Sequence, residues 1–588
     1  MNQNLKTIAL NAWNEPRHFF LWLALASLCG LGAAAAATGL SNPNRWLSFF
    51  ALGCSACFLL SLAAFILALI PPFRRLLSWL LARRFLVLAC LATLVALFYA
   101  AEDWRGRRSW QSFKERAEEK GERFDLVALT PPPVPADQNY FETPLWNDLH
   151  FVRTNDTIVW SDTNWGSHVF FSAFGPNGSK SPSTGNWTKS QRVDLSAWQA
   201  YYRSTNNVFP SPNGPPTNYF PTAASPQSPA ADVLLALGRF NESRQLLIAA
   251  SARPGARFWM NYEAGPGMLL PHLARVKGIA QYLSLHANAS LKAGDRSTAV
   301  EDLKLLFRLM DSIRNEPILI SHLVRMAVLQ IGLQPVWEGL ADQRWTDPEL
   351  NALDGELGRL DFLADYQGAV RGERACNLWA VDYIRKMGLS GWGELLGSEH
   401  EGAAPGELEK FFGQALFQAL PSGWFDQNKL STCRIHQDYI QPAVDHDRHA
   451  ISPAWVKQSQ SAFEHRGWGI YDAFSKYLVP GYAKSVERFA RAQSAVDLAR
   501  LACALERYRL AKGQYPDNLA AVVPQFLTKL PPDVIDGGQL QYRRTTDGRF
   551  LLYSIGWNET DDGGKVELTK QGSPDPHRGD WVWNDPAS

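Results

Sequence analysis

The N-terminal part of the chain carries long uncharged runs separated by short polar segments. No side chain is charged from Phe19 to Asn44, a second uncharged run extends from Trp46 to Ile70, and a third from Phe85 to Ala101. A helix needs about 20 apolar residues to cross a bilayer core of about 30 Å. None of these runs has the polar stripe of a helix on the surface of a soluble protein. The pattern predicts a transmembrane region over residues 1–101, with spans at about 19–41, 46–70 and 85–101; two spans plus an interfacial helix are the alternative.

The charges between these runs predict an orientation. The first loop carries only Arg45, whereas residues 71–84 carry four arginines. Positive residues favour the cytoplasmic side, so the N-terminus is expected inside and everything after Ala101 outside. A basic group at residues 105–116 argues for the opposite orientation, but long domains are translocated largely regardless of their charge.

Two segments of different composition follow the apolar runs. Residues 102–139 begin as a charged, aromatic-containing stretch and end in a proline-rich run, which predicts a helical stalk and an extended connector. Turn-forming residues dominate from 140 to 230 and exclude long helices. The many tryptophans and tyrosines there argue against a flexible linker. We expect a loop and short-strand region with buried aromatic side chains; an exposed aromatic surface for a glycan or peptide is the alternative.

Helical periodicity dominates from 231 to 493. It predicts two helix pairs and further helices at 317–339 and from Pro348 onward; the pairs are 231–237 with 242–250, and 273–292 with 297–313. Thr346 to Glu349 has the pattern of a capped helix start. The turns within the pairs resemble those of tetratricopeptide repeats, although they are spaced more widely than the ~34 residues of a regular array. We expect an irregular helical-hairpin body, a class that often builds scaffolds or concave binding surfaces; an ordinary helical domain is the alternative.

Composition narrows the class of protein further. Hydrophobic residues make up 46% of the 588 residues, so the chain has ample material for a folded core. Lys and Arg total 58 and Asp and Glu total 57, a balance that argues against a nucleic-acid binder relying on bulk charge. Four of the seven cysteines lie in apolar runs, and the other three form no pattern of a disulfide framework.

Candidate chemistry is sparse. The sequence contains no G-x-S-x-G, H-E-x-x-H or Walker A motif, which weakens the hydrolase, metalloprotease and ATPase hypotheses. Its densest polar cluster spans residues 433–449, where His436, His446 and His449 are candidate metal ligands beside Cys433 and several aspartates. Hydrogen bonds and ion pairs at a domain seam are the simpler interpretation of this cluster.

The C-terminal segment, residues 494–588, predicts a helix followed by a small antiparallel hairpin. The last helical turns contain Ala504-Leu-Glu-Arg-Tyr, and a tight turn is expected at Gly513, before Gln-Tyr-Pro. Asp547-Gly548 supplies a hairpin turn between 540–544 and 550–554. This order of motifs, with Leu-Tyr-Ser-x-Gly at 552–556 and Asp-Asp-Gly-Gly at 561–564, resembles the globular part of the major pseudopilin of type II secretion.

That resemblance implies a small α+β module that holds calcium in its last loops. The matching positions are Asp561, Asp562 and Asp580, whose oxygens suit calcium. Pseudopilins begin with a processed leader and a glutamate five residues into one apolar helix; this chain departs from both features, so we expect no assembly into a pilus.

Two more stretches, 131–139 and 323–340, resemble segments of a group of large bacterial membrane proteins. This resemblance supports a similar architecture and gives no information about activity. Together these features predict a membrane-anchored, mainly α protein with three N-terminal transmembrane helices, a tetratricopeptide-like body and a pseudopilin-like α+β module. The expected location is the bacterial inner (cytoplasmic) membrane, multi-pass, with a large extracytoplasmic domain. Expected partners are the lipid bilayer and other envelope proteins, without nucleic acid.

The sequence therefore favours a non-enzymatic scaffold or partner-binding protein. The alternative is an envelope hydrolase or glycan-active enzyme, with a site formed between residues 140–230 and the cluster at 433–449.

Overall fold

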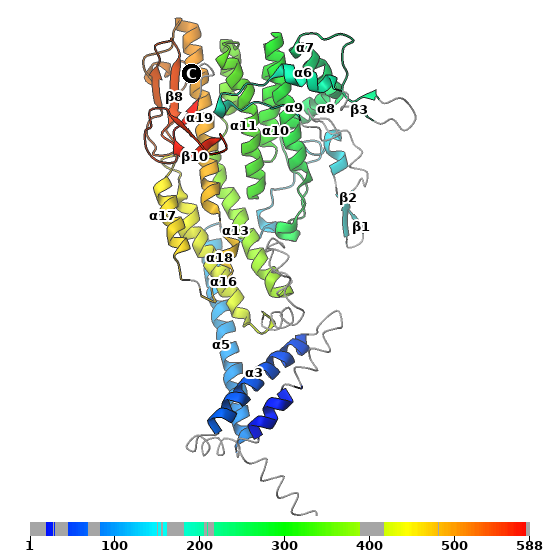
Figure 1. The fold of residues 1–588 in the computed structure, drawn as a ribbon, viewed down its shortest axis with the longest axis vertical. Helices are drawn as coiled ribbons and strands as arrows, with labels where there is room; N and C mark the ends of the chain where they lie inside the picture. The colour runs from blue at the N-terminus through cyan, green and yellow to red at the C-terminus, as the bar shows by residue number, and fades with distance from the viewer. Residues whose placement is uncertain are drawn as a thin grey trace, which may run out of the picture. The chain divides into compact units, whose positions relative to one another are not determined.

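The computed structural model describes residues 19–27, 29, 45–68, 83–149, 151–154, 157–160, 181–204, 208–209, 217–388, 417–467, 469–479 and 481–583. The described part is mainly helical, with a few small antiparallel sheets, as predicted for the fold class (Figure 1). It divides into two compact units. The first contains Met1–Arg123, Cys376–Arg434 and Gly467–Val479, and the second contains Phe124–Ala375, Ile435–Arg466 and Pro480–Ser588.

The first unit contains long apolar helices. α3 (Arg45–Ala68) coincides with the second predicted span, and α5 (Arg84–Glu118) joins the third predicted span to the predicted stalk in one helix. Apolar side chains in the first half of α5 are exposed, with Phe85 at 78% and Leu88 at 61%. Of the first predicted span, 19–41, only 19–27 and 29 belong to the described residues.

Two helices of the described part are long and apolar enough to cross a membrane, namely Phe85–Glu118 and Leu319–Ala341. The second is mostly buried among other helices of its unit and is a core helix. In α3, the described apolar stretch is the shorter Cys57–Ile66. Among the described residues, the structure therefore supports membrane association through α5 and shows fewer membrane helices than the three predicted; most of the first predicted span lies outside these residues.

The folded part of the first unit packs on α5. It contains α16 (Ser422–Ile435, which continues into the second unit) and α18 (Ser475–Leu478). A small core forms from Val381, Ile384, Phe425 and Phe474. α5 and α16 approach closely at Gly106 and Gly423, where a Cβ on either residue would overlap the backbone of the other helix.

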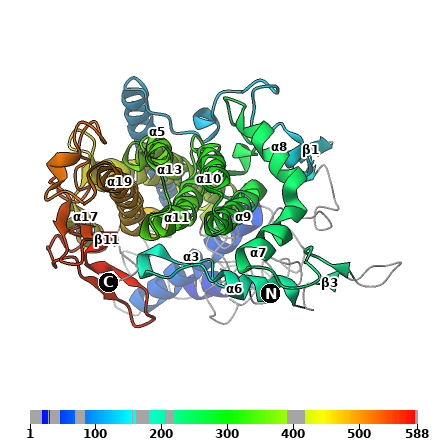
Figure 2. The same ribbon diagram turned by 90° about the horizontal axis from the view of Figure 1, so that it is seen from above.

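The second unit is built on a layer of helices. Its helical elements are α7 (Pro229–Leu237), α8 (Asn241–Ser251), α9 (Pro271–Ala293), α10 (Arg296–Asp311), α11 (Leu319–Ala341), α12 (Asp347–Leu357), the first part of α13 (Phe362–Met387), α17 (Pro453–Glu464) and α19 (Tyr482–Lys512). Both predicted helix pairs are confirmed, as α7 with α8 and α9 with α10. α11 packs on both α9 and α19, and Figure 2 shows it between them.

Local signals explain where these helices begin and end. α9 ends at Gly294, whose φ of 90° is readily available to glycine. The Asp295 carboxylate accepts the Thr298 N–H, 3.1 Å away, at the start of α10. Thr346 and Glu349 form the reciprocal capping box predicted for α12.

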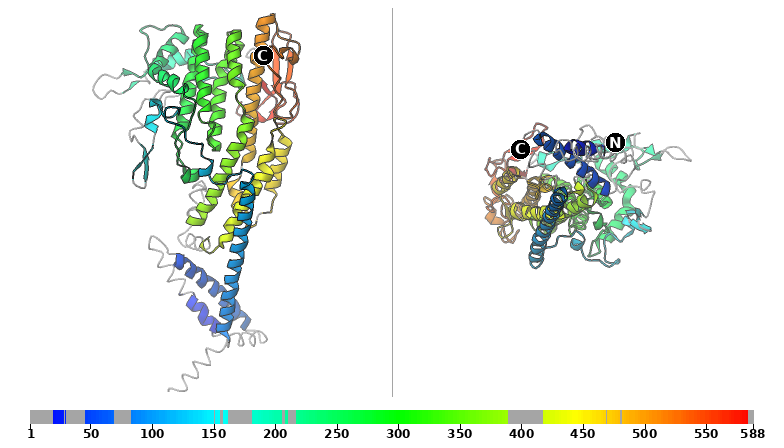
Figure 3. Two further views of the ribbon diagram at one scale, coloured as in Figure 1. Left: turned by 180° about the vertical axis from the view of Figure 1, so that it is seen from behind. Right: turned by 90° about the horizontal axis from the view of Figure 1, so that it is seen from below.

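The C-terminal module has the predicted helix and hairpin. α19 ends before Gly513, which has a φ of 80°. β7 (Gln541–Arg544) pairs antiparallel with β8 (Phe550–Ser554), and β11 (Trp581–Trp583) pairs on the other edge of β8. β9 (Val566–Leu568) and β10 (Pro574–Gly579) form a second small sheet. Both β8 and β11 contact α19, and Figure 3 shows the strands beside this helix.

The aromatic-rich region 140–230 is a set of short elements, as far as it is described. These are η2 (Pro144–Leu149), β1 (Phe151–Thr154), β2 (Thr157–Trp160), η4 (Trp187–Lys189), α6 (Leu195–Arg203), β3 (Val208–Phe209) and β4 (Thr217–Asn218). Trp146 and Trp198 are fully buried, and Trp187 and Tyr202 are nearly so. Burial of the aromatic side chains, rather than an exposed aromatic surface, is confirmed for these residues.

Candidate functional site

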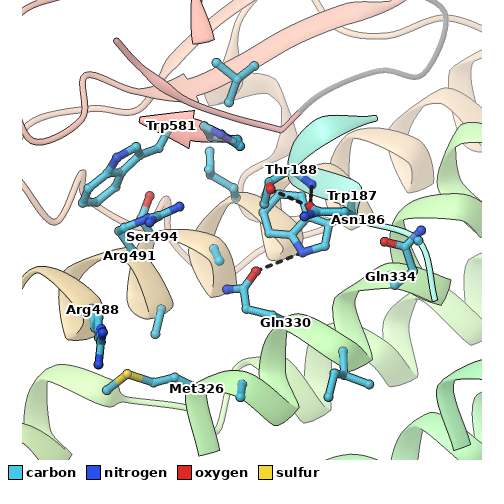
Figure 4. A pocket seen from close by; sticks show the side chains of 18 of the residues that line it. Asn186, Trp187, Thr188, Met326, Gln330, Gln334, Arg488, Arg491, Ser494 and Trp581 are labelled. Carbon is cyan, nitrogen blue, oxygen red and sulfur yellow. Dashed lines mark hydrogen bonds between the residues drawn. The ribbon is translucent and has the colours of Figure 1, made fainter. Parts of the chain in front are cut away.

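The second unit contains a cavity of about 510 Å³, shown in Figure 4. Its walls come from α9, α11 and α19, from residues 184–188, and from the C-terminal strands. Pockets that hold small molecules usually have volumes of about 300–1,000 Å³. The cavity therefore has the size of a ligand site.

Two helices each present one continuous face to the cavity. The α19 face consists of Arg488, Arg491, Ala492, Ser494, Ala495 and Leu498, and the α11 face consists of Leu323, Met326, Ala327, Gln330, Ile331 and Gln334. Most neighbours in these two sets are three or four positions apart, the spacing that places side chains on one side of a helix. Small residues on α19 leave room between the helices, while Gln281 and Ser284 of α9 close the cavity behind α11.

A third wall is formed by the segment around η4. The Trp187 indole N–H donates to Gln330 Oε1 at 3.0 Å, and its ring lies 5.1 Å from the ring of Trp583. The Asn186 side chain caps η4 by accepting the Thr188 N–H at 3.1 Å. These contacts fix an otherwise irregular segment against α11 and β11.

The C-terminal strands supply the fourth wall, with Asp575, Asp580 and Trp581 as its polar members. The Asp580 carboxylate accepts the backbone N–H groups of Gly564 at 2.7 Å and Asp562 at 3.3 Å. Burial raises the pKa of Asp580, and these two hydrogen bonds oppose that effect. The Asp580 carboxylate therefore stabilises the conformation of the loop at residues 562–564.

Several polar atoms of the wall have no partner. Ser494 Oγ, Trp581 Nε1 and Gln334 Oε1 are buried and lack a hydrogen-bond partner among the described residues. Within the same part of the chain, the guanidinium groups of Arg488 and Arg491 form neither a hydrogen bond nor an ion pair within 4.0 Å. Buried polar groups in folded proteins are almost always hydrogen-bonded, so the first three atoms are exceptions. Arg488 is exposed and Arg491 half-buried, so water or a ligand can reach their guanidinium groups.

The electrostatics of the cavity centre on Arg491. Burial lowers the pKa of Arg491, the nearby negative charge of Glu487 opposes this, and the positive charge of Arg488 adds to it. Burial in turn raises the pKa of Glu487, whose carboxylate lies 3.7 Å from His577 Nδ1. A guanidinium remains charged in proteins, so the cavity contains a partly desolvated positive charge.

No family model, curated protein or solved structure matches this chain. The function must therefore be argued from the geometry of its own residues.

The three histidines predicted as metal ligands lie in different surroundings. His436 is buried in a π-helical turn, η8 (His436–Ile440), and burial lowers its pKa to about 3. His446 is exposed, with its Nε2 atom 2.8 Å from Gln367 Nε2. His449 follows in the hairpin of β5 (Val444–Asp445) and β6 (Ala450–Ile451), 4.0 Å from Asp361. Within the described residues, no three His, Cys, Asp or Glu side chains form a group that could hold a metal ion.

The predicted calcium ligands share one loop region, but their oxygens already have other partners. Asp561 Oδ1 accepts the Tyr553 hydroxyl at 2.9 Å and the Gly563 N–H at 2.9 Å. Asp562 accepts from the Asn558 amide at 2.8 Å, and Asp580 accepts the two backbone N–H groups described above. Calcium binding at Asp561, Asp562 and Asp580 stays a prediction.

Sequence reasoning missed the cavity. Its residues come from segments near 186, 281, 330, 491 and 581, which only the tertiary fold brings together. One signal was present in the sequence: Arg488 and Arg491 share a helix face with Ala492, Ala495 and Leu498, an arrangement unlike a uniformly charged exposed face.

Proposed function

We propose that this chain is a membrane-anchored, non-enzymatic binding protein of the bacterial envelope, whose helical body holds a small ligand in the cavity between α11 and α19. Anchoring is supported by α5, whose apolar half is largely exposed in the described structure. Ligand binding is supported by the volume of the cavity and by the two arginines in its lining that have no ion pair within the described chain.

The finer architecture belongs to the same proposal. The N-terminal region would cross the bacterial inner membrane, with α5 as one span, and the body would lie outside the cytoplasm, as the arginines between the second and third apolar runs indicate. The helix pairs would form an irregular tetratricopeptide-like layer, and the C-terminal module would share the fold of pseudopilin globular domains. Other envelope proteins are the expected macromolecular partners.

The observation that carries the proposal is the lining of the cavity. Arg488 and Arg491, which form no hydrogen bond or ion pair within the described chain, stand there beside an apolar surface that includes Leu323, Met326 and Ile331. Such clustering is typical of a binding site, where a few polar groups orient a ligand against apolar walls.

The test is to identify small molecules that co-purify with the full-length protein. Wild type is isolated in lipid nanodiscs, extracted with organic solvent and compared by mass spectrometry with Ala495→Trp, which fills the cavity. Ala511→Trp is the matched control, because Ala511 lies on the same helix and is exposed. We expect a small molecule enriched in wild type and in Ala511→Trp and lost from Ala495→Trp. Identical extracts from all three folded proteins would refute the proposal.

A further inference from the structure

The wall of the cavity is rich in hydrogen-bond donors and poor in free acceptors. Arg488 and Arg491 carry up to five N–H donors each, and no acceptor of the described chain takes any of them. Gln330 uses its oxygen for Trp187, which leaves its amide N–H groups available as further donors. The two carboxylates of the wall, Asp575 and Asp580, already accept backbone N–H groups. A ligand that matches this wall must offer acceptor oxygens.

We propose that the cavity binds a small anionic amphiphile, in which a carboxylate or phosphate group is attached to an apolar body. The proposal rests on the binding function inferred above and specifies its ligand class. Figure 4 shows Arg488, Arg491 and Trp581 on one side of the cavity, and Trp187, Gln330 and Gln334 on the other. The anionic group lies on the arginine side.

The arginine side is suited to an anion because Arg488 and Arg491 form no ion pair within 4.0 Å in the described chain; the charge of Glu487 acts on Arg491 without direct contact. Arg488 is exposed and Arg491 is more enclosed, so the two place one charge near solvent and one deeper in the wall. Hydrogen bonds between a guanidinium and a carboxylate or phosphate are among the strongest in proteins.

The acidic residues nearby do not form ion pairs with these arginines. Asp580 accepts two backbone N–H groups, and Asp575 Oδ1 accepts the His577 N–H at 2.9 Å. The Glu487 carboxylate faces His577 at 3.7 Å. None of the three forms an ion pair with Arg488 or Arg491 among the residues that the structure describes. An exogenous anion would therefore be the first directly paired counterion of these two arginines.

The rest of the cavity demands an apolar body. The lining of the cavity also contains apolar side chains, namely Leu323, Met326, Ile331, Leu498 and Val582, together with the Trp187 ring. A bare inorganic anion would leave this surface without contacts, and burial of apolar area contributes about 25 cal/mol for each Å². An eight-carbon chain is a suitable probe because it is apolar, flexible and small relative to a volume of about 510 Å³.

The test uses three probes that share one chain: octanoate, octyl phosphate and octanol. Binding to the full-length protein in nanodiscs is measured by isothermal titration calorimetry at pH 7, with titration of empty nanodiscs subtracted. Arg491→Gln removes the deeper charge, and Lys484→Gln removes one charge from an exposed site of the same helix outside the cavity. A hydrogen bond to a charged group contributes about 1.5–3 kcal/mol, equivalent to a tenfold or larger change in affinity.

We expect octanoate or octyl phosphate to bind wild type at least about tenfold more tightly than octanol. Arg491→Gln should abolish this preference, and Lys484→Gln should retain it. The tighter of the two anions distinguishes an organic acid from a lipid-derived phosphate. Equal binding of octanol and both anions, or a preference unchanged in Arg491→Gln, would overturn the anionic class. The binding function is tested separately. It stands if Ala495→Trp loses the co-purified molecule, and it falls if the extract of Ala495→Trp is identical to that of wild type.

Discussion

Asp497 gives the stability of the body a predictable dependence on pH. This residue lies inside α19 with 3% of its surface exposed, and both of its oxygens accept from Gln493 Nε2 at 3.2–3.3 Å. Burial raises the pKa of Asp497 to about 7, although the Gln493 hydrogen bond and the charge of Arg500 oppose the change. The folded protein therefore holds the protonated form of Asp497 more strongly than the unfolded chain does.

The sign and size of the effect follow from this difference. Because the folded-state pKa is raised, the stabilisation by Asp497 is present in full below the unfolded pKa of 3.8, declines as the pH rises, and is lost above about pH 7. The two pKa values differ by about three pH units, and each unit corresponds to about 1.36 kcal/mol. We therefore expect Asp497 to reduce the free energy of unfolding by about 4 kcal/mol between pH 4 and pH 8.

Asp497→Asn isolates this contribution, because asparagine keeps an oxygen for Gln493 and has no charge to bury. Thermal unfolding of the full-length protein in nanodiscs is followed by intrinsic fluorescence from pH 5 to pH 8. We expect the variant to unfold about 5 °C above wild type at pH 8, with a smaller difference at each lower pH. Asp447→Asn, at an exposed position, should follow wild type throughout. A gap between Asp497→Asn and wild type that is the same at every pH would refute the reasoning.

Two other changes probe the packing of the second unit. A Cβ at Gly339 of α11 would overlap the Trp345 indole, so Gly339→Ala should lower the free energy of unfolding by about 1–3 kcal/mol. At Gly355 of α12 a Cβ meets nothing within 4 Å, so Gly355→Ala should raise the free energy of unfolding by up to about 1 kcal/mol. Thermal melts in which both variants shift in the same direction would contradict this assignment. Asp365→Asn should lower the free energy of unfolding by about 3 kcal/mol, because Asp365 Oδ2 accepts a hydrogen bond from Nη1 of the fully buried Arg325 at 2.8 Å. Chemical denaturation measures this change, and an unchanged denaturation midpoint would show that the ion pair does not stabilise the fold.

Local sequence signals predicted much of the helical body. Periodicity located both helix pairs, and the turn at Gly294 and the capping box at Thr346 lie where the residues indicate them. The C-terminal hairpin follows from its alternating strands and the turn at Asp547 and Gly548. These features succeed because a cap or a tight turn depends on residues within a few positions of one another.

Features that depend on distant contacts could not be predicted in this way. The cavity brings Trp187 beside Gln330, 143 residues further along the chain, and places Trp581 near α19, which ends at Lys512. The two units are also discontinuous along the chain, so changes in composition could not reveal them. The histidines at 436–449 form no metal-binding group within the described residues. They are close in sequence, but the fold buries His436 and leaves His446 exposed.

α11 shows why a helix's own sequence cannot decide its environment. It passes the same test of length and hydropathy as α5, yet it is buried by its neighbours in the second unit. Its glutamines explain the difference. Gln330 accepts the Trp187 indole N–H, and Gln334 donates to Glu338 at 2.8 Å and to the Gln191 carbonyl at 3.0 Å. In lipid these amides would be costly without protein partners, whereas here they hold the cavity wall in place, so the residues that make α11 a poor membrane span are those that make it one side of a binding site.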